Sequence, residues 1–443
     1  MEIIYLILLT ASCLTGLWIT NNHGAKIFST KLNFAVWYFI VEFFLTAVLA
    51  TYTIDNVGLK TNWVFRLIPE AEFPRFQVIW ILTWSAIAIP VGFIVANFSL
   101  KKLKLMSNYE DFLEKKFVDS FNITIFEKLW LGIVLFYTAF VIYKIGFIPQ
   151  IESLSWSPLE ISHFRGKMTH NFPASVHLKE LIGLRIIPIL SFYYFSKFLR
   201  VKTKPNFLLA LAHIVLSIFF VSINLNKSGI AFYSIGLIIT YGIVKTEIRF
   251  KHILISFAIV FTILLGSYSM VRKDLNLVKL TKGIYHRVVY TQAYGNYYSL
   301  HYFPQKHEHL GFSSISKFIK KFGFNYSPQA SRLMMKVADK KGFEDGRAGY
   351  LTSSFISEAW ANWGIFGIIF GPIFVGFIIK FLIGLLISLP KTDLSCALIA
   401  FSSYALQIGS GINNIIFPRY LIATLSLFFI TYKLTKKKQG KNR

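Results

Sequence analysis

Long apolar runs, separated by short polar and basic loops, follow one another along almost the whole chain. A run of about eighteen apolar residues is long enough to cross about 30 Å of hydrocarbon as a helix. About eleven runs of this kind lie near residues 3–20, 33–51, 77–98, 129–148, 181–198, 206–223, 228–244, 252–269, 364–388, 393–411 and 414–433. The period-two alternation of a membrane-spanning strand is absent. The pattern predicts an all-α polytopic integral membrane protein, with residues 1–443 forming a single membrane domain.

The composition supports the same class of protein. Hydrophobic residues make up 54% of the 443 residues, and the mean hydropathy is +0.54, which exceeds what a soluble surface allows. The first run starts at residue 3 without a basic n-region or a small-residue cleavage site, so we interpret it as a retained helix. Cys13 and Cys396 fall inside apolar runs and lack CxxC spacing, which indicates buried structural thiols.

Lysines and arginines in the short loops predict the orientation of the chain. They cluster at 101–104, 197–204, 245–251 and 433–441, which fall on one side of the membrane in this span count. By the positive-inside rule that side is cytoplasmic, so the N-terminus lies outside and the C-terminus inside. Topology and contact with anionic membrane lipids explain much of the formal charge of +26. Because the basic residues are spread over loops on both sides, no nucleic-acid partner is expected.

Two sizeable loops then lie on the outer side, at about 149–180 and about 270–352, the second before the last three spans. Long loops translocate largely regardless of charge, so the basic residues of the second loop are free for another purpose. Within it, residues 316–322 place two phenylalanines and an isoleucine on one face of a helix and three lysines on the other. Such an amphipathic helix is expected to lie in the membrane interface.

Four cations from four separate spans reach the outer membrane depth. Arg185 lies about one turn into its span, Lys227 begins a span, Arg272 follows the end of one, and Arg419 lies in the first turns of the last. Each alone is an ordinary interface anchor, but together they have no carboxylate nearby in sequence except Asp274. A lysine at a helix start opposes the macrodipole unless an anion fills the gap. The placement predicts a bound polyanion, and a phosphate or pyrophosphate suits the arginine forks best.

Candidate acid–base groups come from the outer loops. Glu358 follows three serines at the outer mouth of the ninth span, and the loops also hold His163, His170, His177, His286, His301, His307 and His309. Glu358 or one histidine is predicted to act as a general base, while the alternative is that Glu358 only complements a helix dipole. There is no HExxH motif, and His307-x-His309 is a weak metal pattern, so no metal and no cofactor are expected.

Several short strings connect these features to a known family. They are Asn226-Lys227-Ser228-Gly229 at a helix start, Arg287-Val-Val-Tyr290 and Phe303-Pro304 in the large outer loop, Ser357-Glu358-x-x-x-Asn362-x-Gly364 before an apolar helix, and Arg419 at the start of the last helix. In combination, and best over residues 220–432, the chain resembles the bacterial O-antigen (Wzy-type) polymerases, or oligosaccharide repeat unit polymerases. Lys227 departs from the family, where arginine is commoner, because lysine lacks the bidentate fork.

The resemblance implies a GT-C-like, metal-independent glycosyltransferase that faces outward from the cytoplasmic (inner) membrane of a bacterium. It would polymerise lipid-linked oligosaccharide repeat units for O-antigen lipopolysaccharide or a capsular polysaccharide. The donor would be a glycan on undecaprenyl pyrophosphate, and the acceptor one lipid-linked repeat unit. A chain-length regulator protein is a further expected partner.

The residues and the resemblance together assign predicted roles. Catalysis is predicted for Glu358, His286, Arg287 and Arg272; pyrophosphate binding for Lys227, Arg185, Arg419 and Arg347; and glycan binding for Arg165, His163, Tyr290 and Asn362. The cations would stabilise charge on the departing pyrophosphate while a base near Glu358 or a histidine deprotonates the acceptor hydroxyl.

Two other functions stay open at this point. An O-antigen ligase of the same class shares the donor but moves the glycan onto a lipid A core. A lipid-linked oligosaccharide flippase or other transporter belongs to a different class and should carry cations through the depth of its helix bundle. The cations of this sequence gather at one surface, which favours the enzyme over the transporter.

Overall fold

The structure is a computed structural model that describes residues 2–24, 36–53, 64–106, 108–118, 123–246, 283, 285–323, 325–346, 348–406 and 408–435. These residues form helices and no strand, which confirms the all-α class. Among them, eight helical stretches are long and apolar enough to cross a membrane: Ile3–His23, Glu70–Lys102, Ile125–Ile145, Val176–Arg200, Lys204–Val221, Ser228–Lys245, Ile365–Ile387 and Ile412–Thr431. Their number indicates a multi-pass membrane protein.

Three of the eleven predicted spans are not among these eight. Residues 252–269 lie outside the described part of the chain. The run at 33–51 forms the π-helix η2 (Val36–Val48) followed by α2 (Leu49–Thr53), and the run at 393–411 forms α20 (Asp393–Ala405), which has only 13 residues.

The predicted span at 393–411 is shorter than expected: α20 ends at Ala405, and two short helices follow it. The 3₁₀ helix η8 (Ile408–Ser410) starts with the N–H of Ile408 donating to Glu42 Oε2 at 2.6 Å. Gly411, with a φ of +108°, then adopts a conformation that favours glycine and precedes α21 (Ile412–Ile416).

The described chain forms two compact units, each assembled from separate segments. Unit 1 contains residues 1–109, 274–385 and 406–418, and unit 2 contains residues 110–273, 386–405 and 419–443. They subdivide the chain that the sequence predicts as one membrane domain.

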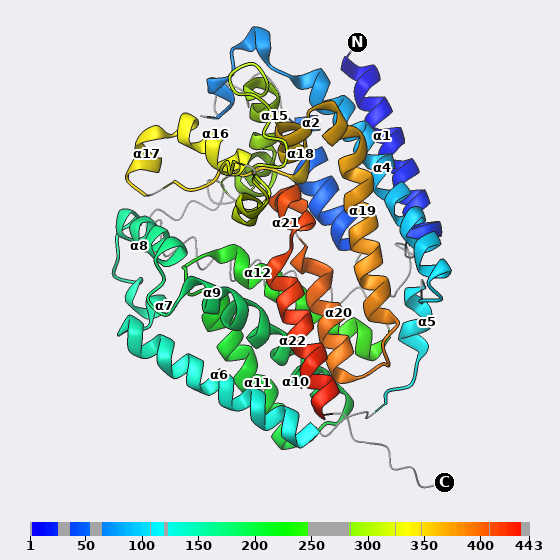
Figure 1. Ribbon diagram of the computed structural model, residues 1–443, viewed down its shortest axis with the longest axis vertical. Coiled ribbons are helices and arrows are strands. Elements are labelled where there is room, and N and C mark those ends of the chain that lie inside the picture. Colours follow the sequence, from blue (N-terminus) through cyan, green and yellow to red (C-terminus); the bar gives the residue numbers. More distant parts are fainter. Residues whose placement is uncertain are drawn as a thin grey trace. The chain divides into compact units, whose positions relative to one another are not determined.

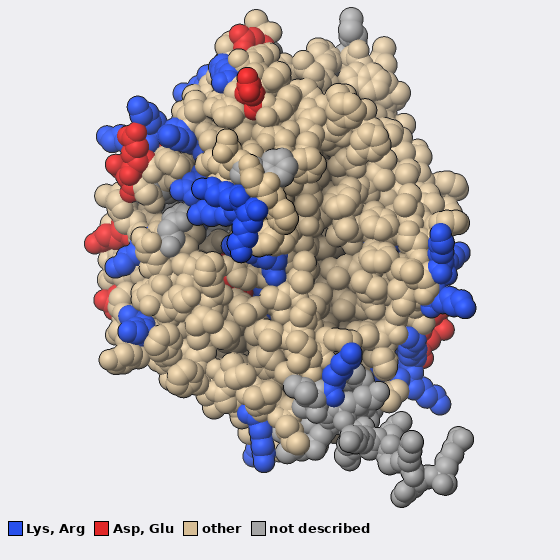
Figure 2. All heavy atoms as spheres, viewed as in Figure 1, with Lys and Arg blue, Asp and Glu red and all other residues tan. Residues whose placement is uncertain are grey.

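The long helices of unit 1 are α1 (Glu2–Ile19), α4 (Arg75–Lys102) and α19 (Ile365–Ile387), and α1 packs along α4 (Figure 1). Two glycines bring α4 and α19 into backbone contact. A Cβ on Gly92 would lie 2.6 Å from the amide nitrogen of Phe377, and one on Gly376 would overlap the carbonyl oxygen of Ile89. In Figure 2 the described surface over the middle of α19 carries no charged side chain, because Lys380 of that helix is buried.

The large predicted outer loop of unit 1 is built of short helices. Its described helices are η6 (His286–Tyr290), α15 (Thr291–Tyr302), η7 (Lys317–Phe322), α16 (Ala330–Ala338) and α17 (Lys340–Glu344). Other described elements of unit 1 are η1 (Thr20–Gly24), η3 (Phe65–Leu67), η4 (Glu70–Glu72) and α18 (Phe355–Trp363). The predicted amphipathic α-helix at 316–322 is the 3₁₀ helix η7. Hydrogen bonds join α15 to the start of α18, among them Ser354 Oγ to Asn296 Oδ1 at 2.7 Å and Ser357 Oγ to the carbonyl of Gly295 at 3.0 Å.

Unit 2 is organised around the buried helix α10 (Ile187–Arg200), which packs against its neighbours α11 (Lys204–Val221), α12 (Lys227–Lys245) and α20. The other helices of the unit are α5 (Tyr109–Glu114), α6 (Ile123–Ile145), α7 (Pro149–Glu152), α8 (Pro158–His170), α9 (Val176–Leu178), η5 (Lys179–Ile186) and α22 (Arg419–Thr435). Every residue from Ile187 to Tyr194 is buried, as expected for a helix that is enclosed on all sides. Helix α10 continues η5 without a break, so the core of the unit fixes η5 as well.

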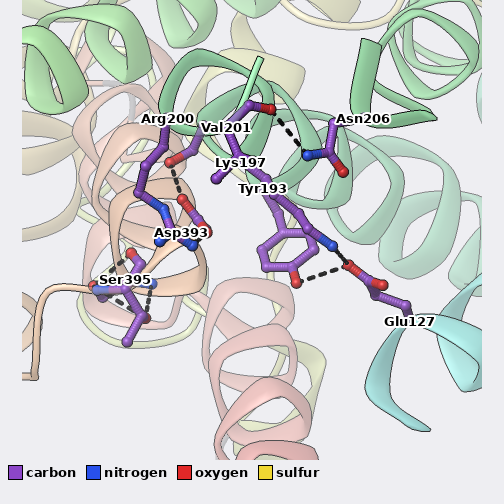
Figure 3. Close-up of polar contacts among 10 residues, drawn as sticks. Glu127, Tyr193, Lys197, Arg200, Val201, Asn206, Asp393 and Ser395 are labelled. Carbon is purple, nitrogen blue, oxygen red and sulfur yellow. Dashed lines mark hydrogen bonds and ion pairs between the residues drawn. The ribbon is translucent and has the colours of Figure 1, made fainter. Parts of the chain in front are cut away.

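Ion pairs hold the C-terminal end of α10 (Figure 3). Arg200 donates to Asp393 Oδ2 at 2.8 Å, and Ser196 Oγ donates to the other oxygen of Asp393 at 2.8 Å. Lys197 pairs with Glu127 of α6, which also accepts a hydrogen bond from Tyr193 at 3.1 Å. Because Asp393 is buried, loss of Arg200 would leave an uncompensated charge, so these contacts fix the rotation of α10.

The glycine contact between α4 and α19 predicts a selective sensitivity to added volume. Gly376→Ala should lower the free energy of unfolding by about 1–3 kcal/mol, because the new methyl group meets a backbone that cannot move independently. The measurement is the thermal unfolding midpoint of the purified protein in detergent. Gly132→Ala in α6 is the matched control, since nothing lies within 4 Å of its added Cβ and alanine favours the helix. Equal midpoints for the two variants would contradict the close contact.

Candidate functional site

Two of the predicted pyrophosphate-binding arginines meet on one aromatic ring in unit 2. The guanidinium carbon of Arg185, in η5, lies 4.9 Å from the ring centroid of Tyr420, and that of Arg419, at the start of α22, lies 4.5 Å from the same centroid. Both distances suit a cation–π contact. Residues more than 230 positions apart in sequence are therefore brought into one cluster, which we call the Tyr420 cluster: His177, Glu180, Arg185, Arg419 and Tyr420.

The other two members of the cluster hold Arg185 and Tyr420 in place. Arg185 Nη1 donates to Glu180 Oε2 at 3.0 Å and to the carbonyl of Glu180 at 2.8 Å. His177 Nδ1 and the Tyr420 hydroxyl lie 2.7 Å apart. The expectation that the cations have no carboxylate nearby except Asp274 is thus wrong for Arg185.

The sequence gives no simple sign of the Glu180–Arg185 pair, because residues five apart do not face each other on an α-helix. Here η5 is wound as a π-helix, whose hydrogen bonds join residues five apart, so the two side chains share a face. A π-turn inside a helix is frequently found at functional sites.

The Tyr420 cluster keeps an excess of positive charge that is accessible. Arg419 and His177 are exposed, and the Arg185 side chain is 24% exposed. Two guanidinium groups face one carboxylate, and no described carboxylate lies within ion-pair distance of Arg419. A guanidinium carries five N–H donors, and at Arg185 the two hydrogen bonds to Glu180 use only Nη1. The arrangement is therefore able to bind an anion with several oxygens, such as a phosphate or pyrophosphate.

A buried lysine that sequence analysis did not select connects the predicted outer loop 149–180 to the start of α12. Lys179 Nζ donates to the carbonyl of Met168 at 2.6 Å, approaches Asn224 Oδ1 at 3.4 Å, and lies 4.9 Å from the centroid of Phe172. Two residues after Asn224, Asn226 caps α12 by accepting from the N–H of Ser228 at 3.3 Å. Lys227 is the first residue of α12, as predicted.

In unit 1, Glu358 and Asn362 share a closed hydrogen-bond network with two residues that the sequence did not indicate, Ser314 and Asn413. Glu358 accepts from the backbone N–H of Asn413 at 3.0 Å and from its Nδ2 at 2.9 Å. Asn362 Nδ2 donates to Asn413 Oδ1 at 2.9 Å, and Ser314 Oγ donates to Asn362 Oδ1 at 2.8 Å. Partners 51 to 99 residues apart carry no local pattern, which is why Asn413 was missed.

Glu358 serves as the cap of a helix other than its own. The N–H of Asn413 belongs to the first turn of α21, so the carboxylate satisfies a donor that has no partner within that helix. The side chain is buried, and a Cβ on Gly411 would overlap its Oε2 atom. Burial raises the pKa of Glu358 to about 7, although the hydrogen bond from the Asn413 backbone acts in the opposite direction.

A second group in unit 1 surrounds η6. The Tyr294 hydroxyl lies 3.1 Å from His286 Nε2, and the ring of Tyr290 lies 5.6 Å from that of His286. Arg287 lies in the same helix between His286 and Tyr290. The predicted catalytic and glycan-binding residues of the Arg287-Val-Val-Tyr290 string are thus neighbours on one short element.

The remaining predicted site residues are spread out. His163 and Arg165 are both exposed on α8, two positions apart, so they do not face each other. Arg272 and Arg347 lie outside the described residues. Of the histidines considered as a base, His301 is buried, with Nδ1 3.0 Å from Glu72 Oε2 and Nε2 2.7 Å from Lys306 Nζ. Burial and the Lys306 ammonium lower the pKa of His301.

Among the described residues, no group of three or more His, Cys, Asp or Glu side chains is placed to hold a metal ion. Comparisons with protein-family models, with curated proteins and with solved structures found no match for this chain.

The buried Glu358 predicts a specific dependence of stability on pH. Because its pKa of about 7 in the folded chain lies above the ordinary value of 4.5, the unfolded chain releases this proton first as the pH rises. The free energy of unfolding should therefore fall between about pH 4.5 and pH 7, by at most about 3 kcal/mol, and stay level above.

This fall should be absent from Glu358→Gln, so the measurement is the thermal midpoint of both proteins across pH 4.5 to 8 in detergent. Glu344→Gln, at an exposed position of α17, is the matched control and should follow the wild type. Parallel curves for Glu358→Gln and the wild type would contradict a raised pKa.

Proposed function

We propose that this protein is a membrane-embedded glycosyltransferase that polymerises lipid-linked oligosaccharide repeat units. The observation that carries the proposal is the pair of arginines, Arg185 and Arg419, stacked on Tyr420 with only one carboxylate between them. Eight helical stretches among the described residues are apolar and long enough to cross a membrane, and in such a protein an accessible cationic cluster suits the charged group of an amphipathic substrate. A polyprenyl pyrophosphate that carries a glycan is such a substrate.

The proposed reaction is a substitution at the anomeric carbon of the donor glycan. The acceptor hydroxyl oxygen forms the new bond to that carbon, the bond from the carbon to the pyrophosphate oxygen breaks, and the pyrophosphate leaves with the electron pair. Arg185 and Arg419 stabilise the negative charge that develops on the leaving group, and we propose a pyrophosphate-binding role for Lys227, the first residue of α12, as well. The acceptor proton passes to a base of the protein.

For that base we propose Glu358 or His286. The pKa of Glu358, at about 7, suits a group that accepts a proton at neutral pH. Its oxygens are engaged by Asn413, so it would give up one of these hydrogen bonds when it takes the proton. His286 already approaches a hydroxyl, that of Tyr294, through a ring nitrogen. We propose a glycan-binding role for Tyr290, Asn362, His163 and Arg165. We also propose that Arg347 binds the pyrophosphate and that Arg272 takes part in catalysis.

The setting that we propose rests on the positive-inside rule and on the resemblance to the O-antigen polymerases. The protein lies in the cytoplasmic membrane of a bacterium with its N-terminus outside, its C-terminus inside and its active site facing outward. The product is an O-antigen or capsular polysaccharide, and a chain-length regulator acts alongside. An O-antigen ligase would use the same donor and the same cations, so the identity of the acceptor separates the two enzymes. A flippase would bind the same lipid without forming a glycosidic bond.

The decisive test combines gene deletion with complementation. The host that lacks the gene should lose the ladder of surface polysaccharide while single repeat units still reach the lipid core, and the wild-type gene should restore the ladder. Arg419→Ala and Arg185→Ala should fail, since removing one donor from a charge-stabilising site costs about 10²–10³ in rate. The measurement is the ladder on a gel, with the membrane level of each variant checked by immunoblot.

A matched control exists on the same helix as Arg419. Lys433→Ala removes a cation that also lies over an aromatic ring, 4.6 Å from the centroid of Phe429, at the other end of α22, and should leave the ladder intact. Loss of even single capped units in the deletion strain would favour ligase or flippase activity. A normal ladder without the gene would overturn the proposal.

A further inference from the structure

A short segment of unit 1 exposes aromatic rings and lysines together. Phe312, Phe318 and Phe322 are 59%, 49% and 68% exposed. Lys317, Lys320 and Lys321 of η7 are exposed as well, and basic side chains gather over the chain that leads into α16 and α17 in Figure 2. Large apolar side chains that are exposed side by side require a partner, since water does not favour them. We call residues 312–322 the Phe–Lys segment.

The rings and ammonium groups of the Phe–Lys segment are in contact with one another. The rings of Phe318 and Phe322 pack edge to face with centroids 5.6 Å apart, and Lys321 Nζ lies 4.9 Å from the centroid of Phe318. Ile319 is the half-buried residue of the same turn, so it attaches η7 to the unit while the phenylalanines point outward. The apolar and cationic side chains are thus mixed on one exposed surface, unlike the two separate faces that the sequence predicts.

Backbone hydrogen bonds fix this segment at the end of a candidate membrane span. The N–H groups of Leu310 and Gly311 donate to the carbonyls of Ala361 and Asn362 at 2.9 and 2.8 Å. The ring of Phe312 packs edge to face on Trp363 with centroids 5.6 Å apart. Helix α19 begins two residues after Trp363, and it is apolar enough to span a bilayer. A segment held at the start of a membrane span is expected to lie at the depth where hydrocarbon gives way to headgroups.

We infer that the Phe–Lys segment is a lipid-binding element that inserts its phenylalanines at the bilayer interface and binds anionic phospholipid headgroups through its three lysines. Aromatic rings favour the headgroup boundary, and lysine stems lie along apolar surface while their ammonium groups reach phosphate oxygens. A protein partner fits less well, because a protein surface that covers three phenylalanines would also have to neutralise three flexible lysines. The inference does not depend on the proposed enzymatic activity.

The test measures where the segment lies in a lipid bilayer of defined charge. A nitroxide label is attached to Phe322→Cys in the full chain after the two buried cysteines, Cys13 and Cys396, are replaced by alanine. The protein is reconstituted in nanodiscs of phosphatidylcholine alone or with phosphatidylglycerol. The collision rates of the label with oxygen, which prefers lipid, and with a water-soluble nickel chelate then report its depth.

In nanodiscs with phosphatidylglycerol, we expect the label to collide with oxygen and to be shielded from nickel. Each lysine near an anionic surface favours the inserted state about fivefold. The variant Lys317→Gln, Lys320→Gln, Lys321→Gln should therefore lose the difference between the two lipid compositions. A label on Glu344→Cys, exposed on α17, is the control and should stay accessible to nickel throughout. A thermal unfolding midpoint of the triple variant equal to that of the wild type reports an intact fold.

Three results would overturn the inference. A label at Phe322→Cys that is as accessible to nickel as the control would place the segment in water. Equal depth in both lipids and in the triple variant would show that the lysines do not recognise anionic headgroups. Shielding from both oxygen and nickel would show that protein, either a second copy or another chain, covers the segment.

Discussion

A charged group inside an apolar helical protein must find a partner, and this constraint fixes much of the structure. The clearest cases are carboxylates that cap helices to which they do not belong. Glu42 accepts from the first N–H groups of η8, and Glu358 accepts from the first turn of α21. Without these oxygens the starts of two consecutive short helices would leave buried donors unbonded, at a cost of about 1–3 kcal/mol for each group. At the start of each of these two short helices in unit 1, a carboxylate from a distant part of the sequence accepts hydrogen bonds from the first N–H groups.

The same constraint separates the structural charges of unit 2 from those that are left for a ligand. Asp393 and Glu127 are both engaged by cations of α10, and Lys179 is surrounded by a carbonyl, an amide oxygen and a ring. Around Tyr420, however, the positive charge exceeds the negative charge and stays accessible. An anion is the component that would complete the balance, which is why the chemistry of a phosphorylated lipid suits this site.

Local signals in the sequence predicted the elements well, and their long-range partners poorly. Apolar run length found eight of the spans, and the string Asn226-Lys227-Ser228-Gly229 indicated the start of α12. The short helix η8 after α20 was not readable, because the carboxylate that caps it, Glu42, lies more than 350 residues away in sequence. Arginines near the starts of two predicted spans indicated a cationic site, although Arg185 lies well inside its helix. The tyrosine that gathers the arginines and the asparagine that engages Glu358 became visible only in three dimensions.

The winding of η5 has a consequence for how this chain tolerates change. A π-turn contains one residue more than the α-helix that would otherwise occupy its place, and one residue of α-helix corresponds to about 100° of rotation. Deleting a single residue between Lys179 and Ile186 would keep the helix continuous but swing everything before it by that angle relative to the buried face of α10. Glu180 would turn away from Arg185, and His177 would turn away from Tyr420. The extra residue therefore sets the rotational register of η5 relative to α10. Insertions or deletions between Lys179 and Ile186 should be far less tolerated than substitutions.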